Sequence, residues 1–509
     1  MSLPILRIDN LKPPLRWKSL AIAAGLLSIT VSPLLGRDVK PAESIEVPAR
    51  FKAATGGKEV TRGSAHDHQT GRWWQLFHDP VLDKLMREAV LGNRDLYQSV
   101  ARVVEAREQA RTIAAGFYPT LSAPLHATRQ RTTNTGPIVR SRIIGSGIFP
   151  AGNGASGPDS FAGQALTNSS NDFSTQLSLG YEVDLFGRIR HAYAQGRATA
   201  QAFEADRRAV ELSLTSQVAA SYFTLRALDS QMALLRRTLR LRADAIQIQE
   251  ARLKAGVAGD IEVFRARFEL ANAEAELADV TQRRAESENA VAVLCGQPAS
   301  GFHLAEHPLD HGLPPPVPIT IPAQLLTRRP DLVEEERRVA AEGEGIKSVK
   351  AEFFPTVNVG ANYGFESADS AELFKDQSHV WSITGGISIP IFEGGRNAAR
   401  LNAARAREQQ ALAAYQQAAL NAFKEAENAL SGLRQRALQA EARGRAAENA
   451  RHVFDIAQKS YREGAINYFE VIDAQRVLLN AELAEVQTLN TRYSATIDLI
   501  RAVGGGYER

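Results

Sequence analysis

The chain has 509 residues, a formal net charge of +3 from 60 basic and 57 acidic side chains, and an aromatic content of 7%. This balance produces no sequence-wide basic field, so composition argues against nucleic acid as a partner. The single cysteine, Cys295, excludes an intramolecular disulfide framework and a multi-cysteine metal site.

Residues 1–36 have the pattern of an export signal. Four basic residues precede the apolar run from Leu20 to Val31, which is too short to span a bilayer as a helix. The sequence LLGR, ending at Arg37, resembles the end of a bacterial lipoprotein signal with arginine in place of the acylated cysteine. We therefore expect export without a lipid anchor, the alternative being an uncleaved apolar segment. Residues 37–71 are polar and predict an extended lead-in.

One unit occurs twice in the remainder of the chain. Arg188 and Gly256 in the first copy match Arg396 and Gly464 in the second, and both offsets (396 − 188 and 464 − 256) equal 208. A duplicated unit of this length predicts a fold built from two like halves. The expected organisation is a first repeat at 72–300, a linker at 301–327, a second repeat at 328–504 and a tail at 505–509.

Each repeat is expected to begin with a helix and to continue with a β-hairpin, at about 119–185 and about 355–392. The strands alternate apolar and polar residues, as Leu177, Leu179 and Tyr181 show, and they have about the length that a tilted membrane strand needs. Covering a soluble core is the commoner role of such strands. The flanking helical sequence is amphipathic on its own account, however, and leaves no separate element to cover this sheet.

Four strands are too few to close a barrel, and an open sheet edge is not permitted in lipid. Several chains must then contribute strands, so the sequence predicts a homo-oligomer. Two chains would supply 8 strands and three would supply 12, and spacing alone does not choose between them.

A long helical hairpin follows each pair of strands, at 188–294 and at 396–503. The first arm of each hairpin contains no proline and would extend on the order of 100 Å as a helix. In the first copy, apolar residues repeat with coiled-coil spacing, and Arg242 and Gln249 occupy the two remaining positions of that seam. Gly256 and Gly464 stand where each arm would end in a tight turn, so we expect two antiparallel coiled coils.

The order and duplication of these features resemble the TolC-type outer membrane efflux protein family, and within it the NodT-like outer membrane factors of tripartite efflux systems. The motifs that carry the resemblance are Trp73-Trp74, the two Phe/Tyr-Pro-Thr strand starts, the Gly-Arg junctions, Arg329-Pro330-Asp331-Leu332 and the two glycine turns. The resemblance implies a mixed fold of helices and membrane strands. Four strands per chain would contribute to a trimeric 12-stranded outer membrane β-barrel, above a long periplasmic α-helical coiled-coil tunnel.

The resemblance further implies a passive exit duct for small molecules, with no cofactor and no enzymatic activity. Its expected partners are two further copies of itself, outer membrane lipid, a periplasmic adaptor, and an inner membrane transporter of RND type. It would lie in the bacterial outer membrane with its helical part in the periplasm.

Family channels close at the periplasmic turns, which suggests an iris-like gate here. Glu470 and Asp473 lie one turn apart on one helix face and would form an acidic constriction in several copies. Arg462 is the nearest substitute for a family arginine that Ile466 replaces. The candidate gate residues are Glu470, Asp473, Glu262, Asp260, Tyr461 and Arg462, with Gly256 and Gly464 as turn glycines. Helix capping is the alternative role of Asp260, Glu262 and Glu470.

Two other interpretations explain fewer features of the chain. A soluble periplasmic coiled-coil adaptor or scaffold would explain the helical arms but not the two-faced strands, and no acid-base or nucleophile constellation indicates an enzyme. The glycine pattern at 152–157 is bracketed by prolines and cannot open a dinucleotide-binding helix. His66 and His68 in a polar linker do not suffice for a metal site, and none is predicted.

Overall fold

The computed structural model describes residues 47–52, 72–131, 169–257, 259–309, 312, 314–317 and 322–506. The expected export segment with Arg37, the glycine pattern at 152–157, and His66 and His68 lie outside these residues. The elements reported below all belong to one unit, Lys40–Arg509. In the described part of the chain, no helix combines the length and the apolar character needed to cross a membrane.

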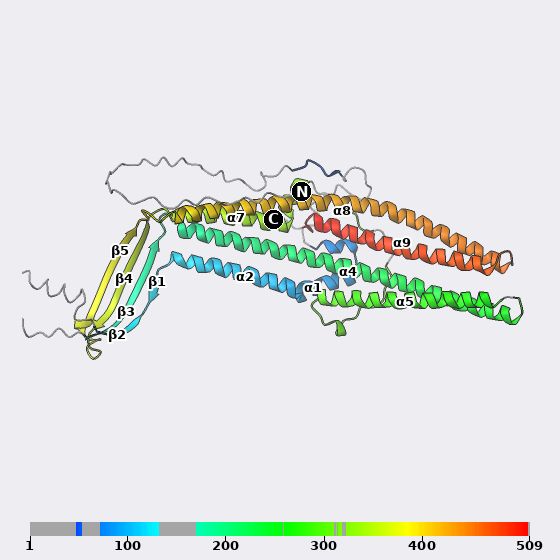
Figure 1. The fold of residues 1–509 in the computed structure, drawn as a ribbon, viewed down its shortest axis with the longest axis horizontal. Coiled ribbons are helices and arrows are strands. Elements are labelled where there is room, and N and C mark those ends of the chain that lie inside the picture. Colours follow the sequence, from blue (N-terminus) through cyan, green and yellow to red (C-terminus); the bar gives the residue numbers. More distant parts are fainter. Residues whose placement is uncertain are drawn as a thin grey trace, which may run out of the picture. The chain divides into compact units, whose positions relative to one another are not determined.

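One antiparallel sheet contains all of the described strands (Figure 1). The strands are β1 (Thr120–Ser122), β2 (Leu125–Arg131), β3 (Ser169–Val183), β4 (Thr356–Ser367) and β5 (His379–Ser388). β1 and β2 pair with β3 in one register, with Thr120 opposite Gly180 and Leu125 opposite Thr175. They therefore form a single strand path that is interrupted at Pro124, which has no backbone N–H to donate. The sheet thus has the four strand paths that the sequence predicts.

Two helical hairpins leave this sheet. The long arms, α4 (Arg188–Lys254) and α8 (Arg396–Arg462), have 67 residues each, and the returning helices, α5 (Asp260–Leu294) and α9 (Tyr468–Ala502), have 35 each. Gly187 and Gly395 precede the long arms with φ of 82° and 85°, a conformation that glycine adopts without strain. Figure 1 shows α4 beside α5 and α8 beside α9, as expected for two antiparallel coiled coils.

Shorter helices complete the length of each arm. They are α1 (Pro80–Gly92), α2 (Arg94–Ala114), α6 (Pro322–Arg328) and α7 (Pro330–Ala351), with 3₁₀ turns at Trp73–Phe77, Ala115–Phe117, Ala299–Gly301 and Asp376–Ser378. Asp79 caps α1 by accepting from the Val81 N–H at 2.8 Å, and Pro80 occupies the first helical position, where no donor is needed. α6 begins within the segment expected to be a linker. Its Leu325 and Leu326 are buried in the core, so the end of that segment is part of the packed structure.

The main hydrophobic core lies where the short helices meet the long ones. Phe223 of α4 and Tyr493 of α9 stack with ring centroids 4.4 Å apart, and Phe77 lies 4.9 Å from Phe223. Trp73 and Trp74 are buried here, and the Trp73 indole N–H donates to Thr215 at 3.3 Å. The tryptophan pair therefore fixes the N-terminal segment to the helices and is not a membrane anchor.

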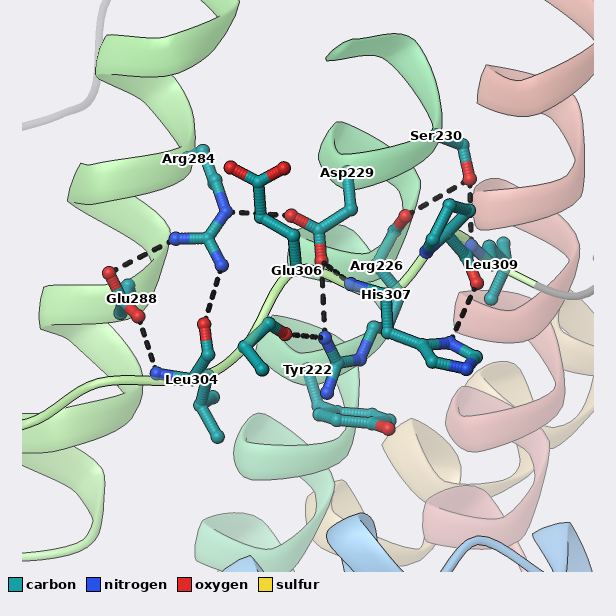
Figure 2. A network of polar contacts seen from close by, with 12 residues as sticks. Tyr222, Arg226, Asp229, Ser230, Arg284, Glu288, Leu304, Glu306, His307 and Leu309 are labelled. Carbon is teal, nitrogen blue, oxygen red and sulfur yellow. Dashed lines mark hydrogen bonds and ion pairs between the residues drawn. The ribbon is translucent and has the colours of Figure 1, made fainter. Parts of the chain in front are cut away.

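Residues 302–309 cross α4 and α5 as a strap that buried charges hold in place (Figure 2). The Asp229 carboxylate accepts from Arg284 at 2.6 Å, from Arg226 at 3.1 Å and from the His307 backbone N–H at 3.0 Å. The two guanidinium groups also donate to strap carbonyl oxygens at Ala305 and Leu304, both at 2.7 Å. Because both arginines and the aspartate are almost fully buried, this network fixes the strap to both helices.

Candidate functional site

The sheet has one polar and one apolar face. The cross-strand row Ser122, Ser178, Asn362 and Ser382 lies on the polar face, and the adjacent row Leu121, Leu179, Ala361 and Ile383 lies on the apolar face. Large apolar side chains on β5 are strongly exposed, with Trp381 at 68%, Ile383 at 74% and Ile387 at 70%. A row of exposed apolar residues on a strand is the pattern of a surface that meets lipid.

Aromatic rings gather where the strands join the helices. Phe186 follows β3 and Phe354 precedes β4, and their rings stack with centroids 4.9 Å apart. Both side chains are partly exposed, and Phe392 beyond β5 is 90% exposed. Aromatic side chains concentrate at membrane–water interfaces, so this belt marks one boundary of the apolar sheet face.

The second part of the site is formed by the two turns at the far ends of the hairpins. Gly256 and Gly464 have φ of 72° and 76°. In each turn, the following residue donates its N–H back to the last helical turn, Val257 to the Arg252 carbonyl at 3.0 Å and Ala465 to the Ser460 carbonyl at 2.9 Å. Both turns are therefore the same glycine C-cap, as the spacing predicts.

The acidic residues at the first turn act at the helix start. Glu262 accepts a hydrogen bond from the Gly259 N–H at 3.1 Å, which is the half of a capping box that a glycine N-cap allows, and Asp260 is the exposed first residue of α5. Carboxylates in this position are stabilised by the positive end of the helix dipole. For Glu262, the geometry supports the capping role.

The acidic pair at the second turn differs. Asn467, not Glu470, caps α9, because its side chain accepts from the Glu470 N–H at 3.2 Å. The Glu470 side chain is exposed in the first turn of α9. Asp473 is 43% exposed and pairs with Arg476 at 2.6 Å. An ion pair this exposed contributes little stability, and both carboxylates are accessible to solvent.

Tyr461 joins the two hairpins. Its hydroxyl accepts a hydrogen bond from Gln249 Nε2 of α4 at 2.8 Å, and the Arg252 guanidinium lies 5.3 Å from the centre of its ring. Its ring also lies 5.4 Å from that of Tyr468. Arg462 is exposed, so Arg252 and not Arg462 is the arginine that the structure places beside Tyr461.

Sequence reasoning missed the partners of Tyr461, although a signal was present. Gln249 and Arg242 are the two polar positions of the α4 seam, and the structure buries both, at 1% and 6% exposure. Arg242 pairs with Glu269 of α5 at 3.0 Å. A buried polar side chain needs a partner, so polar residues at seam positions indicate where helices are linked.

Burial shifts the pKa values of two side chains in this region. It lowers the pKa of Arg242 despite the nearby Glu269, and together with Tyr461 it raises the pKa of the Tyr468 hydroxyl to about 12. The Tyr468 hydroxyl therefore stays protonated to a higher pH than an ordinary tyrosine. A further contact between the hairpins is made by Arg265 of α5, whose guanidinium lies 5.3 Å from the centre of the Phe469 ring of α9.

Known proteins resemble this chain in both sequence and fold. The family model described as outer membrane efflux protein matches residues 85–297 and 321–505. The pyoverdine export outer membrane protein OpmQ of Pseudomonas aeruginosa is 31% identical, over 86% of this chain and 88% of its own. The cation efflux system protein CusC of Escherichia coli is 28% identical, over 97% and 100%. The solved outer-membrane channel OprN has a TM-score of 0.78 at 27% identity, covering 90% of this chain and 97% of that one.

Proposed function

Because this chain belongs to the outer membrane efflux protein family, we propose that three copies of it assemble into one channel, which is gated at the two glycine turns. It is an outer membrane channel of tripartite efflux systems and not an enzyme, which confirms the family, fold class and function predicted from the sequence. The soluble adaptor alternative is thereby set aside.

The open edges of the sheet support assembly. The strand order places β1 and β2 at one edge and β5 at the other, so each edge carries backbone groups without a partner strand. Lipid offers no hydrogen bonds to such groups, and a neighbouring subunit has to supply them. Three subunits with four strand paths each give the 12 strands of a barrel with an open lumen.

The helices carry a matching signal for assembly. α4 and α9 pack against each other and α5 and α8 lie on their outer sides. Each outer helix has an exposed stripe of apolar and small residues at coiled-coil spacing. On α5 the stripe is Ile261, Phe264, Phe268, Ala271, Ala275 and Ala278, and on α8 it is Leu438, Ala442, Ala446, Val453 and Ile456. Two different stripes on opposite sides of one subunit fit a head-to-tail ring.

The single observation that carries the gate is the Gln249–Tyr461 hydrogen bond. It ties the end of α8 to the end of α4 where the chain turns, so it holds the two hairpins together at the tunnel entrance. Glu470 and Asp473 follow on α9, and in three copies their carboxylates would make the entrance electronegative. Breaking the tie would separate the hairpins and widen the entrance.

The proposed partners are a periplasmic adaptor and an inner membrane transporter of RND type. We propose that the transporter selects the cargo, because two relatives of similar identity are named for different cargoes, pyoverdine and cations. The channel would then contribute a passive path, with a charge preference set at its entrance.

Planar bilayer recordings test the gate. The double variant Glu470→Ala, Asp473→Ala is expected to lower cation preference and raise single-channel conductance, because it removes the negative charge at the constriction. The matched control is Asp498→Ala, which breaks an equivalent exposed pair with Arg501 near the other end of α9. Selectivity and conductance that remain unchanged in the double variant would exclude these two acids from the gate.

A further inference from the structure

We infer that Glu482 is a positioning residue for the gate. It marks the point on α9 from which the tip of the α8–α9 hairpin, the part between Glu482 and the turn at Gly464, moves as one body. The inference rests on the proposed gate at the turns. It concerns a residue outside the candidate gate set, which lies 14 residues along α9 from Tyr468 (482 − 468), or about 21 Å along the helix.

The Glu482 carboxylate joins three helices. Its side chain is only 4% exposed, and its two oxygens accept from different helices, one from Arg237 of α4 and the other from Arg451 of α8 at 2.9 Å. A buried carboxylate held by two guanidinium groups is costly to separate from both, because its charge would be left unpaired, and losing either one removes a charge-assisted hydrogen bond. We call Glu482, Arg237 and Arg451 the clasp. It keeps α4, α8 and α9 together at the height of Glu482.

Hydrophobic packing changes partners at the same level. Towards the turn, one cluster is built from α8 and α9 alone, and it contains Phe454, Val471 and Leu478. A separate cluster begins at Leu479, just before Glu482, and joins α9 to α4 and α5 through Leu479 and Leu483. The tip of the α8–α9 hairpin is thus a packing unit of its own, and Glu482 lies where α9 passes from one cluster to the other.

Polar and cation–π contacts link this tip to the α4–α5 hairpin. They are the Gln249–Tyr461 hydrogen bond and the Arg252–Tyr461 and Arg265–Phe469 contacts already described. Such contacts can be exchanged for water at low cost, whereas separating a packed apolar cluster exposes its surface. Opening should therefore break these contacts and leave the α8–α9 cluster intact. The motion should be confined to the part of the hairpin between Glu482 and the turn.

Distances between equivalent spin labels in the assembled full-length channel test this boundary. Val477 and Gln487 are both exposed and lie five residues on either side of Glu482 (482 − 477 and 487 − 482), so cysteines at these positions form a matched pair. Burial raises the pKa of the native Cys295 thiol to about 11, which keeps it protonated and unreactive during labelling. The gate is released by Gln249→Ala together with Tyr461→Phe.

With Glu482 present, gate release should change the label distance at 477 and leave the distance at 487 unchanged. Adding Glu482→Gln should extend the change to 487, because the amide carries no charge to hold both arginines. Asp229→Asn is the matched control, since it also removes a buried carboxylate bound by two arginines, but on α4 beneath the strap. It should leave the distance at 487 unchanged in the gate-released channel.

The alternative outcomes separate the two ideas. Equal changes at 477 and 487 with Glu482 intact would overturn the boundary while leaving the gate in place. A distance at 487 that Glu482→Gln leaves unmoved would also overturn it. No change at either position after gate release would overturn the proposed gate and the boundary together.

Discussion

Asn93 and Arg329 hold the same place in the two halves of the fold. Asn93 stands at the break between α1 and α2, and its Nδ2 donates to the Leu294 carbonyl at the end of α5 at 3.0 Å. Arg329 stands between α6 and α7, and its Nη1 donates to the Ala502 carbonyl at the end of α9 at 3.2 Å. In both halves a side chain at the helix break binds the end of the returning helix. Duplication has kept this contact while the residue that makes it has changed.

This helix junction makes Gly296 a sensitive position. A Cβ at Gly296 would lie 2.0 Å from the Gly92 carbonyl oxygen, and its φ is 70°. Gly256 has nearly the same φ, 72°, with open space around it. Both alanine variants incur left-handed strain of about 1 kcal/mol, but only Gly296→Ala adds a backbone clash. Thermal unfolding followed by circular dichroism should show a clearly larger drop in Tm for Gly296→Ala than for Gly256→Ala. Equal drops in Tm would contradict the close approach of Gly296 to Gly92.

The two sheet faces predict opposite responses at neighbouring positions. Ile383→Arg places a charge on the apolar face and should cost about 2–4 kcal/mol near the middle of the bilayer, whereas Thr384→Arg places it on the polar face at little cost. The yield of heat-modifiable oligomer in outer membrane fractions measures the difference. If Thr384→Arg were the more damaging of the two, the assignment of the faces would be reversed.

The exposed stripes on α5 and α8 predict a cross-link between subunits. Ala275 lies 15 residues from the start of α5 (275 − 260) and Ala446 lies 16 from the end of α8 (462 − 446), so both are at similar distances from the turns. Ala275→Cys with Ala446→Cys should give oxidised products of up to three subunits. Pairing Ala275→Cys with Ala414→Cys, about 48 Å further along α8, should give none. A ladder that stops at two subunits would refute the trimer.

The strap over α4 and α5 predicts a large effect from one carboxylate. Asp229→Ala leaves the buried Arg226 without its charge partner and leaves Arg284 with Glu288 alone, so it should cost about 3–5 kcal/mol. Glu306→Gln breaks the exposed pair with Arg236 in the same strap and should cost at most about 1 kcal/mol. Urea unfolding of the purified channel compares the two, and similar midpoints would show that the strap carries no buried network.

The elements with a periodic signal could be predicted from the sequence. The strands alternate, the long arms have coiled-coil spacing and no proline, and Gly256 and Gly464 mark their ends, so these features were predictable from short windows. The identity of the family also followed, because the motifs occur in a fixed order and twice. Pro124 divides the first strand into β1 and β2, a local effect of one missing N–H that alternation does not register.

Contacts between distant residues could not be predicted in this way. Gln249 meets Tyr461 across 212 positions, and Asp229 meets Arg284 across 55, distances along the chain that no periodicity encodes. Comparison of the two halves offers a partial signal. At an offset of 208, Arg226 corresponds to Arg434, but Asp229 corresponds to Ala437, so the carboxylate occurs only in the half that carries the strap.

The two open edges of the sheet also affect how fast the channel can form. A subunit that entered the bilayer alone would take the unpaired backbone of β1, β2 and β5 with it, and each unpaired group costs several kcal/mol in hydrocarbon. Insertion therefore has to wait for encounters between subunits. Its rate should rise more steeply than linearly with chain concentration, and dilution should leave unassembled chains outside the membrane.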